Sequence, residues 1–291
     1  MAQKVRKAVI PAAGLGTRVL PASKAVPKEM LPIVDKPAIQ YIVEEAVAAG
    51  IEDILIITNR GKDLIEDHFD GVPELEEHLL KSGKQHAYDE VVSLAHLANI
   101  SFIRQKETRG LGHAIACAKA FVGDEPFAVL YGDDVIIGED PACGQLIRAY
   151  EETGKGVVGV NAVREEDIHR YCSLKVEPLK DNWFTCTDMV EKPSKEQIFS
   201  LYSILGRCIL TPEIFDILEH TTPGANNEIQ LTDAMAELAR RDGMVAVDFT
   251  GTRYDMGNKL GIMQAQIEVA LKHPEIAEDF KAYLKSLIQT L

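Results

Sequence analysis

The first half of the chain alternates between short apolar runs and longer amphipathic segments. The apolar runs predict strands at residues 5–10, 54–58, 100–103 and 127–131. The amphipathic segments predict helices at residues 39–49, 63–69, 112–121 and 143–152. Apolar strands separated by amphipathic helices are typical of βαβ units, so we expect a mainly parallel sheet that is covered on both faces. Ligands of such sheets bind at the carboxyl ends of the strands.

The pattern changes after Gly156, where strand-like runs follow one another with few helices between them. These runs lie at residues 157–163, 174–177, 183–190 and 202–210 and predict a mixed or antiparallel extension of the sheet. Helices are expected next at 211–218 and 228–240, and Asn226 or Asn227 is the expected N-cap of the second. A strand at 245–249, a loop at 251–257 and terminal helices at 259–271 and 274–288 are expected after them. No repeat or linker divides the chain, so we expect one α/β domain over residues 1–291.

Composition agrees with a globular protein, since 46% of the 291 residues are hydrophobic and 26% are charged. No run of 18 apolar residues and no signal-peptide core are present, so we expect a cytoplasmic protein that binds no membrane. The five cysteines are scattered and include no Cys-x-x-Cys pair. This spacing favours neither a disulfide framework nor a zinc site.

Charge is distributed unevenly along the chain. A net charge of -14 argues against a nucleic-acid-binding protein, because the field of the protein would repel a phosphate backbone. The first 36 residues, however, contain seven Lys or Arg residues and two acidic ones, a local charge of +5. This start is compatible with a site for a small anion or with a basic tail.

The predicted strand 5–10 runs into the glycine turn Pro11-Ala-Ala-Gly-Leu-Gly-Thr-Arg18. Small residues in such a turn let backbone amides approach a phosphate. The dinucleotide fingerprint needs a third glycine, where Val19 stands, and the chain has no Gly-Lys-Ser or Gly-Lys-Thr tripeptide of a P-loop. On its own the turn is either a phosphate site or a tight connection.

Two cations follow in positions that suit a polyphosphate. Arg18 ends the glycine turn, and Lys28 lies between Pro27 and Pro32, which stiffen its loop. The guanidinium of Arg18 can grip phosphate as a fork, whereas Lys28 acts as a point charge. The alternative is a solvated surface loop.

Asp133 and Asp134 come directly after the apolar run 127–131, so we expect them at the carboxyl end of a buried strand. Carboxylates there can hold Mg²⁺, which prefers one or two of them together with substrate phosphates and water, so a second acidic residue is expected from elsewhere. For an isolated Asp-Asp pair the alternative is a turn or a helix cap. His68, His113 and His169 have no ligand-like partners in the sequence, and we assign them no chemistry.

The blocks AAGLGTR at 12–18 and PKEMLPIVDKPAIQY at 27–41 resemble the signature of sugar-nucleotide pyrophosphorylases, most closely that of the bacterial glucose-1-phosphate uridylyltransferases. Further matching blocks cover nearly the whole chain and lie at residues 110–114, 131–134, 190–193, 205–207, 228–233 and 255–261. The resemblance implies a three-layer, Rossmann-like nucleotidyltransferase fold with a sugar-side β extension. It also implies a nucleotide-binding half at 1–155, a sugar-binding half at 156–257 and C-terminal helices at 258–291.

The reaction implied by the resemblance joins UTP and glucose 1-phosphate into UDP-glucose and pyrophosphate, with Mg²⁺ as cofactor. A homo-oligomer, either a dimer or a tetramer, and a place in carbohydrate metabolism are further implications. The acceptor phosphate has a second pKa near ~6 and is largely ionised at neutral pH, so in-line attack on the α-phosphate needs no general base.

The resemblance also assigns site residues. Arg18, Lys28 and Lys192 are expected to be catalytic, with Lys192 on the phosphate of glucose 1-phosphate. The metal is expected on Asp133 and Asp255. The nucleotide is expected to contact Ala12, Ala13, Gly14, Glu29, Gln105 and Gly110, of which Gln105 and Gly110 would recognise uracil. The sugar is expected to contact Asp134, Cys172 and Glu191.

One residue departs from the family pattern, because relatives commonly have glycine where this chain has Cys172. The Cβ atom of Cys172 is therefore expected to narrow the sugar pocket. Two alternatives to the proposed activity remain. One is a glucose-1-phosphate thymidylyltransferase, and the other is a catalytically weak paralogue that binds a UDP-sugar and regulates a partner. The retained Arg18, Asp133 and Asp255 argue against the second alternative.

Overall fold

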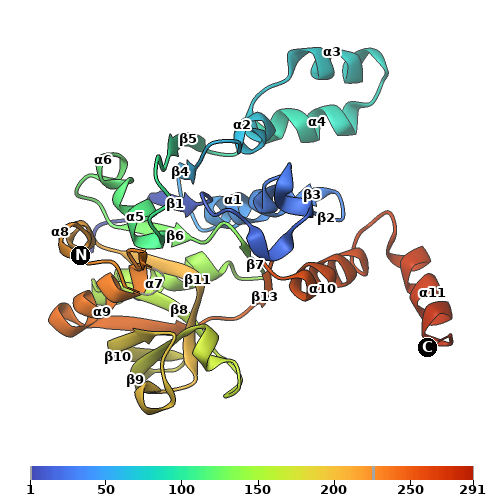
Figure 1. Cartoon of the computed structure of the whole chain (residues 1–291). Coiled ribbons are helices and arrows are strands. Elements are labelled where there is room, and N and C mark those ends of the chain that lie inside the picture. Colours follow the sequence, from blue (N-terminus) through green and yellow to red (C-terminus); the bar gives the residue numbers. More distant parts are fainter. Residues whose placement is uncertain (1, 225–226, 291) are drawn as a thin grey trace.

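The computed structural model describes residues 2–224 and 227–290. Over these residues the chain forms a nine-stranded sheet in the order β5-β4-β1-β6-β11-β8-β12-β10-β9 (Figure 1). Neighbouring strands are parallel from β5 to β6 and between β8 and β12, whereas β11 and β10 each run antiparallel to both of their neighbours. The predicted mixed, mainly parallel sheet is therefore confirmed.

The strands of this sheet are β1 (Lys7–Pro11), β4 (Asp53–Thr58), β5 (Asn99–Arg104), β6 (Phe127–Leu130), β8 (Val157–Ala162), β9 (Cys172–Lys180), β10 (Trp183–Glu191), β11 (Tyr202–Leu210) and β12 (Met244–Asp248). Two further pairs lie outside it, namely β2 (Pro32–Ile33) with β3 (Lys36–Pro37), and β7 (Asp134–Ile137) with β13 (Thr252–Asp255). The helices are α1 (Ala38–Ala48), α2 (Asp63–Phe69), α3 (Pro73–Lys81), α4 (Gln85–Leu94), α5 (Leu111–Ala116), α6 (Lys119–Val122), α7 (Ala142–Thr153), α8 (Glu213–His220), α9 (Leu231–Asp242), α10 (Lys259–Ala270) and α11 (Ala277–Ile288).

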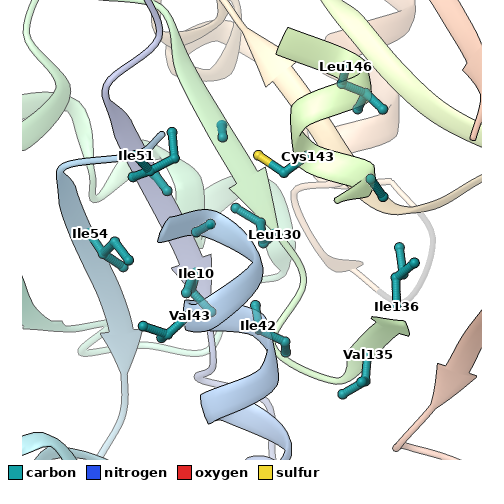
Figure 2. Packing of buried hydrophobic residues seen from close by; sticks show 14 of the residues in the cluster. Ile10, Ile42, Val43, Ile51, Ile54, Leu130, Val135, Ile136, Cys143 and Leu146 are labelled. Carbon is teal, nitrogen blue, oxygen red and sulfur yellow. The ribbon is translucent and has the colours of Figure 1, made fainter. Parts of the chain in front are cut away.

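Helices cover both faces of the sheet, which gives three layers. Alternate residues of β1 enter different cores, since Ala8 and Ile10 belong to one buried cluster and Val9 to the other. The first cluster includes side chains from α1, α2, α7 and α10, and the second includes side chains from α5, α6, α8 and α9. Figure 2 shows Ile42 and Val43 of α1 close to Ile10, within the first core. This two-sided burial explains why the strands of the first half are apolar throughout.

Several segments differ from the expectation. The helical hairpin α3–α4 was not predicted, because its residues are mostly polar and Leu79 alone is buried among its described side chains. It lies apart from the sheet in Figure 1. The helix predicted at 112–121 is divided into α5 and α6. The predicted loop 251–257 is wrong in part, since it contains strand β13, whose Asp255 pairs with Asp134 of β7.

The N-terminus of α9 also differs from the expectation. The helix begins at Leu231 with Gln230 as its N-cap, so the predicted cap at Asn227 is wrong, and Asn226 lies outside the described residues. Asn227 has a positive φ of 58°, which places it in the connection before the helix. Of the helices that the structure describes, none is both long and apolar enough to cross a membrane.

Candidate active site

Two cavities open at the carboxyl ends of β1 and β6 and meet at three shared residues, Leu111, Tyr131 and Asp133. The first cavity has a volume of about 420 Å³ and is lined by the glycine turn after β1. The second has a volume of about 520 Å³ and is lined by the ends of β9 and β10. Asp133 therefore lies where a ligand in one cavity would meet a ligand in the other.

The predicted cations and metal ligands form one charged cluster at this junction. Nζ of Lys28 lies 2.5 Å from Oδ2 of Asp133. The guanidinium of Arg18 lies 3.6 Å from Asp133 and 3.4 Å from Asp255. Burial opposes ionisation of Asp133, but Lys28 and Arg18 outweigh it and lower the pKa of this carboxyl. Asp133 is thus held as a carboxylate.

The position of Asp255 depends on local backbone packing. Pairing of β13 with β7 brings it beside the Asp-Asp motif, and the backbone amide of Met256 donates to the carbonyl of Asp133 over 2.8 Å. A Cβ atom on Gly257 would overlap the guanidinium of Arg18. The sequence block around Gly257 therefore allows Arg18 to approach Asp255.

The donor set suits a hard cation such as Mg²⁺. Asp133 and Asp255 face the same guanidinium, and carboxylate oxygens are the ligands that magnesium prefers. Across residues 2–224 and 227–290 no group of three or more His, Cys, Asp or Glu side chains forms a metal cage. The protein would therefore supply two carboxylates, leaving the other positions to substrate phosphates and water.

Asp134 has a different environment from Asp133. It is buried and accepts hydrogen bonds from Arg253, with Nη2 2.5 Å and Nε 2.7 Å from Oδ1. Burial raises the pKa of Asp134 to about 6, an effect that Arg253 opposes and Asp133 increases. Both Asp134 and Arg253 line the second cavity. Arg253 was not predicted as a site residue, although its place two residues before the predicted metal ligand Asp255 is a signal for one.

The sugar-side residues come from the paired ends of β9 and β10. Glu191 lies opposite Cys172 in the register of these strands. Its carboxylate accepts a hydrogen bond of 3.1 Å from Thr232, and burial raises its pKa. Lys192 follows with a positive φ of 47°, and its amide donates to the carbonyl of Tyr171 over 2.8 Å. All of these residues line the second cavity, as predicted for Cys172, Glu191 and Lys192.

The sulfur atom of Cys172 is directed toward β11. It accepts a hydrogen bond of 3.3 Å from the amide of Ile204 and lies 3.4 Å from Oγ of Ser203. Burial raises the pKa of the thiol to about 11, so it stays protonated at neutral pH. The side chain contributes to the packing of the second core as well as to the wall of the cavity.

The expected uracil-binding residues lie together in the first cavity. Gln105 donates to the carbonyl of Gly110 over 3.1 Å and lies 2.9 Å from Nδ1 of His113. Gly110 has a φ of +100°, and a Cβ atom there would lie 2.7 Å from the carbonyl oxygen of Ile229. Glycine is therefore required at this position by both the backbone angle and the close approach.

Glu29 also borders the first cavity but is only 1% exposed. Both of its carboxylate oxygens accept hydrogen bonds from Nζ of Lys62, at 2.9 and 2.8 Å. The pair lies beneath the glycine turn, because Lys62 also donates to the carbonyl of Ala12. Lys62 was not predicted as a site residue; it lies between the strand predicted at 54–58 and the helix predicted at 63–69.

The family model described as nucleotidyl transferase matches residues 7–271. A UTP–glucose-1-phosphate uridylyltransferase of Staphylococcus epidermidis is 53% identical over 285 residues, which cover 98% of this chain and 99% of that protein.

Two solved structures share both fold and sequence with the chain. A UDP-glucose pyrophosphorylase complexed with UDP-glucose has a TM-score of 0.85 and 41% identity, covering 92% of this chain and 100% of the other. The UTP-bound enzyme of Acinetobacter baumannii has a TM-score of 0.90 and 37% identity, and the match covers 97% of this chain and 99% of the other. The predicted family is confirmed, and the chain belongs to the nucleotidyl transferase family.

Proposed function

We propose that this chain is a UTP–glucose-1-phosphate uridylyltransferase, which makes UDP-glucose and pyrophosphate. The observation that carries the proposal is the junction of the two cavities at Asp133, where Lys28 and Arg18 gather. Relatives with 53% identity over nearly the whole chain carry the same activity in their names.

UTP is proposed to occupy the first cavity, with uracil near Gln105 and Gly110 and the triphosphate along the glycine turn. Glucose 1-phosphate is proposed to occupy the second cavity, with its hydroxyls near Glu191 and its phosphate near Lys192. The arrangement of the linings supports this division, since Lys192 borders only the second cavity and Gln105 only the first. We propose that most nucleotide contacts come from the half at 1–155 and most sugar contacts from the half at 156–257. The division is not complete, since Asp133 and Asp134 also line the second cavity and Glu228 lines the first.

In this arrangement the ionised acceptor phosphate attacks the α-phosphorus of UTP and pyrophosphate leaves. Lys28 and Arg18 offset the negative charge of the triphosphate, and Lys192 orients the acceptor. No side chain is needed to remove a proton, because the phosphate monoester is largely ionised at neutral pH.

Nucleotidyl transferases generally use a divalent metal ion, and we propose Mg²⁺ held by Asp133 and Asp255. When bound, it would neutralise charge on the phosphates of the nucleotide. The arrangement of these two carboxylates around Arg18 supports the assignment.

The direct test measures pyrophosphate release with UTP, dTTP, ATP and GTP, each paired with the 1-phosphates of glucose, galactose and N-acetylglucosamine. We expect the highest kcat/KM with UTP and glucose 1-phosphate, and loss of activity after chelation that Mg²⁺ restores. Preference for dTTP would instead support the thymidylyltransferase alternative, and binding of UDP-glucose without turnover would support the regulatory one.

The homo-oligomeric state and cytoplasmic location stay predictions. Light scattering would test the first, and cell fractionation the second.

A further inference from the structure

The glycine turn after β1 presents two backbone amides that have no partner of their own. Ala13 and Gly14 line the first cavity. Within the part of the chain that the structure describes, neither of their amides donates a hydrogen bond, although Ala13 is only 4% exposed. A buried amide such as that of Ala13 normally has a partner, whereas Gly14 is exposed, so both amides can donate to an anionic ligand.

The carbonyl groups of the same peptide units are bound from the opposite side. Lys62 donates through Nζ to the carbonyl of Ala12, and Asn59 donates through Nδ2 to the carbonyl of Ala13. Lys62 and Asn59 line a separate, smaller cavity and not the first one. In a planar trans peptide the carbonyl of one residue and the amide of the next point in opposite directions. Fixing the two carbonyls therefore directs the amides of Ala13 and Gly14 toward the first cavity.

The donor Lys62 is itself held in place. It is 6% exposed, and Glu29, at 1%, accepts from it at 2.8 and 2.9 Å. Asn59 is 9% exposed and lies at the end of β4, which pairs with β1 as far as Pro11. The two donors thus come from a buried connection next to the turn.

We propose that Lys62 and Asn59 are positioning residues, which orient the amides of Ala13 and Gly14 for the phosphates or the nucleoside of UTP. This inference rests on the proposed function for the identity of the ligand. The orientation of the amides is a property of the free protein and can be measured without any nucleotide.

The test compares Lys62→Met with the wild type and with a matched control, Lys7→Met. Lys7 bonds a carboxylate, Glu125 at 2.6 Å, and a backbone carbonyl, Val122 at 3.0 Å, and it lies at the other end of β1. By calorimetry we expect Lys62→Met to weaken UTP binding about tenfold, with the KM for glucose 1-phosphate unchanged, and Lys7→Met to leave both unchanged. Equal losses in the two variants would overturn the proposal.

Removal of Lys62 also leaves Glu29 buried without its partner, which can destabilise the fold. The double variant Lys62→Met/Glu29→Gln separates the two effects when it is compared with Glu29→Gln alone, because Glu29 itself borders the first cavity. We expect it to unfold at a temperature closer to that of the wild type while its UTP affinity stays low, since the carbonyl of Ala12 still lacks its donor. Recovery of UTP affinity together with stability would show that Lys62 serves only the ion pair.

Lys62→Arg, which keeps a donor, is expected to recover part of the UTP affinity. A loss of UTP affinity equal to that of Lys62→Met would contradict the proposal.

A measurement on the free protein distinguishes this inference from the proposed function. Amide resonances of Ala13 and Gly14 are expected to shift in Lys62→Met and Asn59→Ala but not in Lys7→Met. If wild-type protein bound no UTP but these shifts occurred, the function would be wrong and the positioning role correct. Unchanged resonances would overturn the positioning role whatever the nucleotide.

Discussion

Nζ of Lys28 lies 2.5 Å from Oδ2 of Asp133, a contact that joins the segment after β1 to the loop between β6 and β7. This contact lies at the junction of the two cavities. The two residues are far apart in the sequence, and the parallel pairing of β1 with β6 brings their strands side by side. The contact keeps a cation and a proposed metal ligand together where the reaction is expected.

Asp133→Asn is expected to lower kcat by at least about a hundredfold without unfolding the protein, because a neutral amide is a poor magnesium ligand. Steady-state pyrophosphate release at moderate Mg²⁺ measures the effect. Asp140→Asn is the control, since Asp140 pairs with Arg148 at 2.5 Å and lines neither cavity. Wild-type turnover in Asp133→Asn would remove this residue from the proposed site.

Lys192→Ala is expected to weaken glucose 1-phosphate binding by about 1.5 to 3 kcal/mol, or roughly ten- to a hundredfold, with little effect on UTP. The reason is its place after β10, beside Tyr171 on the wall of the second cavity. Calorimetric titration with each ligand measures both affinities. A variant that lost UTP affinity and kept its affinity for glucose 1-phosphate would contradict the division between the cavities.

Arg18 also borders the second cavity, but its guanidinium lies 3.6 Å from Asp133, where the two cavities meet and where the triphosphate is proposed to lie. Arg18→Ala is therefore expected to show the opposite pattern, with the larger loss on the UTP side. Its guanidinium contacts both Asp133 and Asp255, so some loss of kcat is expected as well. The decisive quantity is the loss of UTP affinity divided by the loss of glucose 1-phosphate affinity, measured in Arg18→Ala and in Lys192→Ala. Equal ratios in the two variants would argue against separate roles.

Cys172→Gly is expected to widen tolerance for sugar 1-phosphates other than that of glucose, because it removes a Cβ atom from the wall of the second cavity. Cys172→Ala is the matched control, since it removes the sulfur contacts with Ser203 and Ile204 but keeps Cβ. Relative kcat/KM across a panel of sugar 1-phosphates measures the change. The same profile in both variants would show that Cβ does not limit the sugar.

Glu45→Gln is expected to destabilise the fold by about 3 to 5 kcal/mol, because it leaves the guanidinium of Arg207 buried without its charged partner. Nη2 of Arg207 lies 2.6 Å from Glu45 and 2.9 Å from the carbonyl of Asp134, so the pair also supports the site. The control Glu44→Gln affects a more exposed pair with Lys36 and is expected to cost about 0 to 1 kcal/mol. Urea unfolding of both variants gives the comparison, and equal costs would contradict the expectation.

Much of the fold could be predicted because burial on both faces makes the strands of the sheet apolar. The helix predicted at 63–69 coincides with α2, and the strand predicted at 202–210 coincides with β11. The hairpin α3–α4 could not be predicted in this way, since it has almost no buried side chains to impose an apolar period. Strand β13 was missed because it pairs with β7 far along the chain, and tertiary pairing leaves little trace in local sequence.

The candidate site, like the fold, could be predicted only where the local sequence carries a recognisable motif. Motif resemblance drew attention to Asp133, Asp255 and Arg18, which the structure brings together. Arg253 and Lys62 escaped it because their roles depend on partners distant in sequence, Asp134 and Glu29 respectively. The burial of a lysine or arginine leaves no mark in the local sequence, and the only indication for Arg253 was its place two residues before Asp255.

The position of β11 beside β6 has a consequence for synthesis of the chain on the ribosome. β6 pairs with β1 on one edge, and its other edge pairs with β11, which is formed by residues 202–210 and is synthesised much later. Until those residues leave the ribosome, the apolar strand Phe127–Leu130 presents an open edge, which is the kind of surface that pairs with other chains. A fragment ending near residue 155 would keep that edge permanently. The two halves proposed to bind the two substrates are therefore not expected to fold as separate pieces. The nascent protein is expected to depend on its later strands for protection against aggregation.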